Sequence, residues 1–131
     1  MTARRSTWEA DLAAYLAQKA TEPFEYGVND CCLFGAGAAA AQTGVDNAAA
    51  FRGRYSTEIG AARALRRIGA GDIESTFDSF YPERPIGFAR RGDLVFNGEA
   101  VGVCIGAVAV FLSDDGYSHV PRAQWRKVWA V

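Results

Sequence analysis

The N-terminal half of the chain has hydrophobic residues at the three- and four-residue spacing of amphipathic helices. Three helices are predicted from this pattern, over residues 8–19, over 31–43, and from Ser56 or Thr57 to residue 68. Signals at the helix ends agree: Ser6 and Glu9 form a capping box, Asp30 is a favourable N-cap, and Gly44 supplies a left-handed stop. The arginines of the third segment fall on its other face, where exposure to solvent is the simplest interpretation.

After Gly87 the pattern changes to short β-rich segments separated by turn residues. Strands are predicted at 94–96, 101–105, 108–112, around Val120 and at 125–131. Turns at Asn97-Gly98, at Gly106 and at Asp115-Gly116 would join them into an antiparallel meander. Helices followed by such strands predict an α+β domain, with N-terminal helices packed on a C-terminal antiparallel sheet. No repeat or long linker divides residues 1–131, so a single domain is expected.

Aromatic residues near the C-terminus give two further expectations. Trp125 and Trp129 are four residues apart on a predicted strand, so they should project to the same face and close the core. Phe77, Phe80 and Tyr81 precede a proline-containing loop and are harder to place in a core. They are predicted to form an exposed docking patch, the interface of the domain.

Composition narrows the class of protein. The chain has 131 residues, 50% of them hydrophobic, and a formal net charge of −1, which fits one folded domain and gives no basic field for nucleic acid. The longest uncharged apolar stretch, residues 100–112, is too short to cross a bilayer. The N-terminal segment lacks the apolar core of an export signal. We therefore expect no nucleic-acid partner, no membrane insertion and no Sec signal peptide.

Cys31, at the start of the second predicted helix, is the residue best placed for chemistry. The positive end of a helix dipole favours the thiolate, and free backbone amides there can hold an oxyanion. The alternative is that Cys31 is a packed core thiol, the role expected for Cys32 and Cys104. Three cysteines without a Cys-x-x-Cys or a close Cys/His pair predict free thiols, no metal and no cofactor.

Four segments resemble, in order, the successive motifs of the NlpC-like, papain-related cysteine peptidases. They are PFEYG at 23–27, DCCLF at 30–34, RGDLV at 91–95 and VGVCIG at 101–106. The resemblance implies a papain-like fold of NlpC type, with the nucleophile at a helix start, and cleavage of peptide bonds in bacterial cell walls. The chain is more closely similar to small proteins of phage tail gene clusters and gene transfer agents. These share its short length, the stretch at 43–46 and an aromatic C-terminal strand at 125–131.

Carried over residue by residue, the resemblance gives Cys31 the place of the nucleophile. Ala100 occupies the position where active members have the catalytic histidine. Alanine can neither accept the thiol proton nor return one to the leaving amine, so the acid–base half of the mechanism is missing there. His119, the single histidine of the chain, is the remaining candidate base. The other interpretation of His119 is a partly exposed residue at a strand edge.

The resemblance thus predicts a tail-tip component of a phage or gene transfer agent, with a degenerate active site and a role in assembly or docking. Its partners would be other tail or tail-hub proteins, and it would be made in the bacterial cytoplasm and located in the virion tail. An alternative function is an active peptidoglycan endopeptidase, with Cys31 as nucleophile, His119 as displaced base and peptidoglycan as partner. A third is a cytosolic domain in which Cys31 is only a packed thiol.

Overall fold

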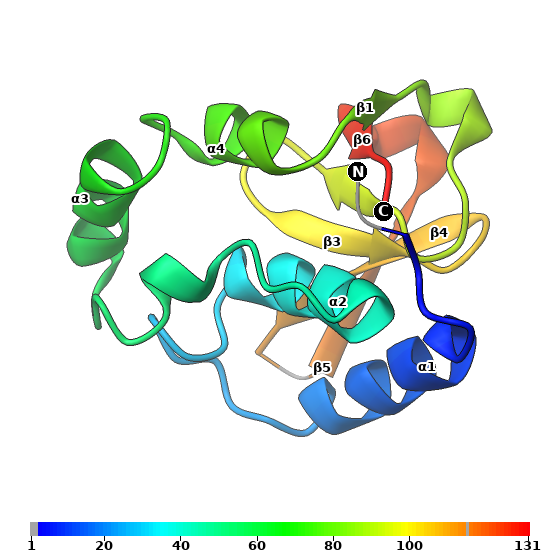
Figure 1. Ribbon diagram of the computed structural model, residues 1–131, viewed down its shortest axis with the longest axis horizontal. Helices are drawn as coiled ribbons and strands as arrows, with labels where there is room; N and C mark the ends of the chain where they lie inside the picture. Colours follow the sequence, from blue (N-terminus) through cyan, green and yellow to red (C-terminus); the bar gives the residue numbers. More distant parts are fainter. Residues whose placement is uncertain (1–2, 115) are drawn as a thin grey trace.

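The computed structural model describes residues 3–114 and 116–131, and within these ranges four α-helices precede a six-stranded antiparallel sheet (Figure 1). The helices are α1 (Trp8–Lys19), α2 (Leu33–Thr43), α3 (Glu58–Arg67) and α4 (Ile73–Phe80). The strands are β1 (Glu83–Arg84), β2 (Leu94–Phe96), β3 (Val101–Cys104), β4 (Val108–Ser113), β5 (Gly116–Pro121) and β6 (Lys127–Trp129). Short 3-10 helices are η1 (Ala49–Phe51), η2 (Ile86–Phe88) and η3 (Arg122–Gln124). This arrangement confirms the predicted α+β class, and none of the helices in these ranges is long and apolar enough to cross a membrane.

Most of the predicted helix ends are correct. Gly44 ends α2 with a φ of 80°, and the Thr57 side chain caps α3. The predicted capping box at Ser6 does not form, because Thr7 occupies the N-cap position and makes no side-chain cap bond. The Thr7 hydroxyl instead donates to the carboxylate of Asp11 at 2.7 Å.

Strands β2 to β5 form the predicted meander, whereas β6 returns to the other side of β2. The order across the sheet is β1-β6-β2-β3-β4-β5, and Trp129 of β6 pairs with Leu94 of β2. After β5 the chain crosses the sheet face that is turned away from the helices, where Trp125 packs with Phe111. Trp125 and Trp129 therefore lie on opposite faces, and the expectation of one shared face was wrong. Asp115 of the predicted 115–116 turn lies outside the described residues.

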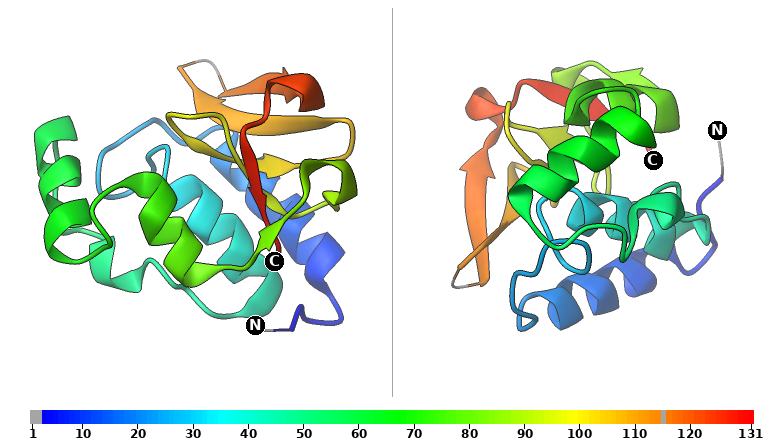
Figure 2. Two further views of the ribbon diagram at one scale, coloured as in Figure 1. Left: turned by 90° about the horizontal axis from the view of Figure 1, so that it is seen from above. Right: turned by 90° about the vertical axis from the view of Figure 1, so that its left-hand side faces the viewer.

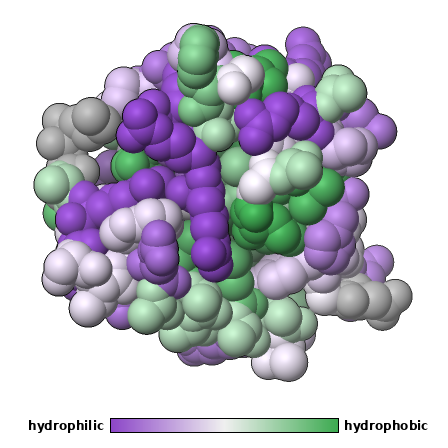
Figure 3. All heavy atoms as spheres, turned by 90° about the vertical axis from the view of Figure 1, so that its right-hand side faces the viewer, coloured by the Kyte–Doolittle hydropathy of each residue, from purple (hydrophilic) through white to green (hydrophobic). Residues whose placement is uncertain are grey.

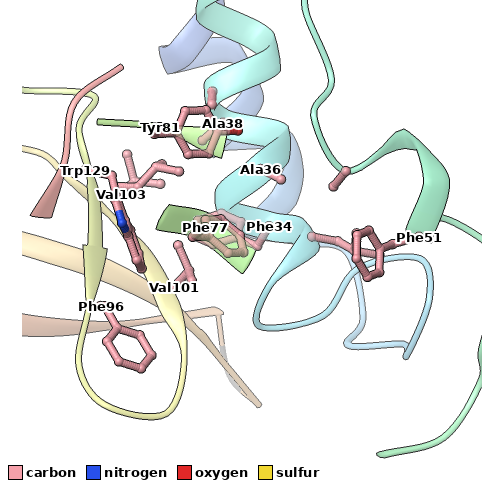
Figure 4. Close-up of a cluster of buried hydrophobic side chains, with 14 of the residues drawn as sticks. Phe34, Ala36, Ala38, Phe51, Phe77, Tyr81, Phe96, Val101, Val103 and Trp129 are labelled. Carbon is pink, nitrogen blue, oxygen red and sulfur yellow. The ribbon is translucent and has the colours of Figure 1, made fainter. Parts of the chain in front are cut away.

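The helices and the sheet form two layers, with the main core between them (Figure 2). Helix α2 is the centre of this core, and it packs on α1 and on β3. Figure 4 shows Phe34, Ala36 and Ala38 of α2 among side chains from the sheet, including Val101 and Val103. Helix α3 stands at one end of the molecule, far from α1 in Figure 1, and makes few contacts with other elements.

The predicted docking patch of Phe77, Phe80 and Tyr81 was wrong. Phe77 is 3% exposed and Tyr81 is 9% exposed in the main core, and Phe80 packs against that core. The reason is helix α4, which begins at the N-cap Asp72 and turns Phe77 onto the ring of Trp129, 5.2 Å away between centroids. This helix was not predicted, because it has only eight residues and two prolines follow it closely, so its periodic pattern is weak.

Hydrophobic side chains do reach the surface on other elements. Phe88 of η2 is 73% exposed, and Ile105, in the turn after β3, is 36% exposed. Arg122 holds these two segments side by side, because its guanidinium donates to the carbonyls of Ile86 and Gly106. They lie on the right-hand side of Figure 1, the face on which Figure 3 shows a hydrophobic patch beside a band of hydrophilic side chains.

Candidate functional site

A buried carboxylate, Asp30, organises the turn that leads into α2. It is 2% exposed and accepts backbone N–H groups from Gly27 (2.9 Å), Cys32 (3.0 Å) and Leu33 (2.9 Å). Its other donor is the Tyr55 hydroxyl, at 2.6 Å. Two of these N–H groups belong to the start of α2, so Asp30 is the cap that the sequence predicted, although the regular helix begins at Leu33. Four donors fix its orientation and leave it no role as a base.

Cys31 is held against the first residue of β3. Its carbonyl oxygen accepts a hydrogen bond from the Val101 N–H at 3.0 Å. This bond joins the start of α2 to the start of the strand, one residue after Ala100. The backbone of Cys31 therefore lies beside Val101, the residue that follows Ala100.

Cys31 and Cys32 line a hollow of about 200 Å³ between the start of α2, helix α3 and the turn from β2 to β3. Helix α3 contributes one face, and two loop tyrosines, the turn, Asp30 and Ile73 of α4 also line the wall. The lining residues from these elements are Glu58, Ala61, Ala62, Leu65, Tyr26, Tyr55 and Glu99. The hollow thus combines thiols and an apolar helix face with carboxylates.

The two thiols interact directly, with their Sγ atoms 3.9 Å apart. The hydrogen bond from the Cys32 thiol lowers the pKa of Cys31, while burial and the nearby Asp30 carboxylate act in the opposite direction. The same bond, together with burial, raises the pKa of Cys32 well above its ordinary value. Cys31 is therefore the member of the pair that ionises first.

Ala100 does not face the hollow. It packs against the smaller core on the far side of the sheet, because side chains alternate along β3 and Val101 points toward the helices. Its neighbour Glu99 lines the hollow instead. Among the described residues that surround Cys31 there is no imidazole, and the charged groups of the wall are carboxylates.

His119 lies away from Cys31. It is exposed on the edge strand β5, opposite Val110 of β4, which in turn lies opposite Val103 of β3. Two strand spacings, on the order of 10 Å, separate it from β3. It does not line the hollow, so the structure does not bring His119 to Cys31. Cys104, as expected, is fully buried, and it lies in the core on the far side of the sheet.

Sequence reasoning missed several residues of this site. Tyr55 is 25 positions from Asp30, and no local pattern signals their bond. Glu58 comes from α3, whose packing over the hollow is a tertiary feature. Glu99 could have been predicted from the sequence. Side chains alternate along a strand, so Glu99, two residues before the inward-facing Val101, should lie on the helix side of the sheet. Within residues 3–114 and 116–131, no three His, Cys, Asp or Glu side chains gather as metal ligands would.

Comparisons with known proteins give a family but no activity. Neither the curated proteins nor the solved structures yielded a match to the chain. One family model, described as a domain of unknown function, matches residues 3–131 and so covers nearly the whole sequence. The chain therefore belongs to the DUF6950 family.

Proposed function

We propose that this chain is a tail-tip component of a phage or gene transfer agent, with an NlpC-like fold that serves docking and assembly without proteolysis. The observation that carries the second half of this proposal is the wall around Cys31, in which the described charged side chains are carboxylates and none is an imidazole. Cys31 lies beside the start of β3, and the described residues that line its hollow include no group that could both accept the thiol proton and return one to a leaving amine.

Peptide cleavage by a thiol needs a base for the thiol proton and an acid for the leaving amine. Apart from the capped Asp30, the charged side chains among the described residues of the wall are those of Glu58 and Glu99. The Glu58 carboxylate acts against the Cys31 thiolate by repulsion, since it raises the pKa of that thiol. These surroundings disfavour the imidazolium–thiolate chemistry of a cysteine peptidase.

The tail assignment is supported by the sequence resemblance, namely the order of the four motifs and the stretches at 43–46 and 125–131. The family match adds the extent of the domain and no function. Tail and tail-hub proteins are the partners that this proposal requires, and the virion tail is the location.

A second candidate, a peptidoglycan endopeptidase, is favoured by the lowered pKa of Cys31 and by the hollow that this residue lines. For this function His119 would have to reach Cys31 from the exposed edge strand β5. The place of His119 gives this candidate no support, so it ranks second.

Complementation of a gene deletion separates the two candidates. The gene is deleted in its particle-producing strain and replaced by the wild type, by Cys31→Ala, or by Cys104→Ala as a matched control at a buried thiol. We expect the chain in purified particles and the same infection or gene-transfer titre with wild type and Cys31→Ala. Purified particles without the chain would overturn the tail assignment. A titre lost with Cys31→Ala, while the variant is folded and incorporated, would establish the enzyme instead.

A further inference from the structure

The strongest unassigned feature is the pair of adjacent thiols at the start of α2. Cys31 and Cys32 are both half-buried, and their sulfurs are 3.9 Å apart. Cys31 lines the 200 Å³ hollow, whereas Cys32 also borders a small apolar cavity walled by Phe51, Phe77 and Phe80. Both residues therefore border the hollow, Cys32 also borders the apolar cavity, and the two sulfurs are within contact distance.

We propose that Cys31 and Cys32 form a reversible redox site, in which a hydroperoxide oxidises Cys31 and Cys32 then closes a vicinal disulfide. This inference goes beyond the proposed function and does not depend on it. It assigns the two thiols a modification chemistry that needs no base and no peptide substrate.

The reaction balances with hydrogen peroxide as the oxidant. The Cys31 thiolate attacks one peroxide oxygen, the O–O bond breaks, and the departing hydroxide takes up a proton as water, which leaves a sulfenic acid. The Cys32 sulfur then attacks the Cys31 sulfur, the S–O bond breaks, and the hydroxyl leaves with the Cys32 proton as a second water. Two thiols and one peroxide thus give one disulfide and two waters.

The surroundings select the order of these two steps. Thiolate is the reactive form, and the hydrogen bond from Cys32 favours it at Cys31. Cys32 keeps its proton, because burial and the adjacent Cys31 both raise its pKa. Cys104 lies in the core on the other face of the sheet and is too deeply buried to compete as resolving thiol.

A bridge between neighbouring residues is strained here, which makes it easy to reduce. Adjacent Cα atoms are about 3.8 Å apart, less than the roughly 4.4–6.8 Å of ordinary disulfides, and strain raises the reduction potential. The backbone resists adjustment, since the Cys31 carbonyl is bonded to Val101 and the Cys32 N–H to Asp30, each at 3.0 Å. Closing the bridge must distort these bonds, so the oxidised protein should melt at a lower temperature than the reduced one.

The test uses the reduced, full-length protein with one equivalent of hydrogen peroxide, followed by intact-mass spectrometry and peptide mapping. We expect the protein to lose the mass of two hydrogen atoms and peptide mapping to show a Cys31–Cys32 link. Glutathione should restore the reduced protein. The oxidised protein should have a lower melting temperature than the reduced one. Cys104→Ser should behave as wild type. Cys32→Ser should stop at a Cys31 sulfenic acid that dimedone traps, and Cys31→Ser should react on the order of tenfold more slowly.

Three results would overturn the proposal: sulfinic acid on Cys31 beside an unmodified Cys32, a disulfide between two chains as the main product, or loss of the reaction in Cys104→Ser. Because the assay needs neither particles nor a host, its failure is separate from failure of the tail assignment. A wild-type titre in the Cys31→Ala strain likewise leaves this chemistry standing.

Discussion

At the scale of single residues, the site depends on one side chain more than on the cysteine beside it. Asp30 binds the loop at Gly27, the start of α2 and the hydroxyl of Tyr55 with two oxygens. A buried carboxylate is tolerated in a protein interior only when donors surround it. Asp30 therefore positions Cys31 without taking part in chemistry.

The bond from Tyr55 to Asp30 is testable by removing one hydroxyl. Tyr55→Phe leaves the carboxylate with one donor fewer in a partly buried place, and we expect the free energy of unfolding to fall by about 2 kcal/mol. Urea denaturation measures the difference. Tyr26→Phe is the matched control on the same hollow, because its ring lies edge-on against Phe24 and its hydroxyl has no described partner. Equal losses in both variants would contradict the role given to Asp30.

How far the site was predictable depends on the range of each interaction. Cys31 and its cap Asp30 are sequence neighbours of α2, so local rules place them correctly. The position of His119 depends on the pairing of three strands, which a sequence read residue by residue does not give. Ala100 illustrates both cases. The resemblance identifies it as the position of the missing histidine, but only the alternation along the strand shows that its side chain faces away from the hollow.

At the scale of elements, the small residues of α2 determine how closely this helix packs on its neighbours. Every residue from Leu33 to Ala39 is buried, and glycines at 35 and 37 let the helix approach its neighbours. A Cβ atom on Gly35 would collide with the side chain of Val101, and one on Gly37 with the hydroxyl of Tyr15. These glycines fit α2 between the sheet and α1, which holds the Cys31 turn against β3.

Gly35→Ala should therefore destabilise the protein even though alanine favours helices. The gain in helix propensity is about 1 kcal/mol, whereas overpacking a rigid core costs about 1–3 kcal/mol. Val101 is fully buried and β-branched, so it has little freedom to move, and we expect a net loss. Gly87→Ala is the control, because nothing lies within 4 Å of a Cβ there. Thermal denaturation in which Gly35→Ala melts at or above the wild type would disprove the close approach.

The element-level prediction succeeded where end signals and periodicity agreed. Helix α2 ends at Gly44 and β2 spans Leu94–Phe96, as the pattern indicated. It failed at α4, where a short helix carries its hydrophobic residues into a core that only the sheet completes. The pattern also did not predict that β6 lies beside β2, because strand order is decided by tertiary packing.

Helix α3 should be the least stable of the elements around the site. Ala64 is its one fully buried side chain, and the helix makes few contacts elsewhere. Gly53 precedes the helix and Gly71 follows it. Both have a positive φ, and nothing lies within 4 Å of a Cβ atom built on either of them. We expect the backbone amides of α3 to exchange with deuterium roughly two orders of magnitude faster than those of α2. Equal protection in the two helices would show that α3 is a firm wall of the hollow.

At the scale of the whole molecule, two cores share one sheet, and a second buried carboxylate ties the chain ends to it. Asp93 is fully buried, accepts the N–H groups of Arg90 (2.8 Å) and Val131 (3.1 Å), and pairs with Arg84 at 2.8 Å. Arg4 approaches the same carboxylate at 3.6 Å. The Arg91-Gly92-Asp93 triplet thus leads into β2 and serves the fold, since its carboxylate is buried and partnered.

Four tyrosines make the whole fold sensitive to alkali. Burial raises the pKa of Tyr81 and of Tyr117 to about 12, and it also raises the pKa values of Tyr15 and Tyr55. In the unfolded chain these hydroxyls ionise near the ordinary value of 10.0. Below that pH both states keep the proton, and the contribution of the tyrosines to stability is complete. Above it only the unfolded chain ionises, so stability is lost as the pH rises toward 12.

Urea unfolding at a series of alkaline pH values, followed by tyrosinate absorbance, tests this expectation. The midpoint urea concentration should fall steeply above pH 10, and the tyrosinate signal should rise together with the loss of structure. Lys127, whose pKa is raised by its hydrogen bond to Glu74, weakens the fold in the same pH range, so the absorbance is needed to assign the effect. Tyr117→Phe should make the fall shallower, because one shifted hydroxyl is removed. Absorbance that rises around pH 10 beyond the share of the partly exposed Tyr26, while the fold stays intact, would mean that the four hydroxyls titrate in the native state and that solvent reaches them there.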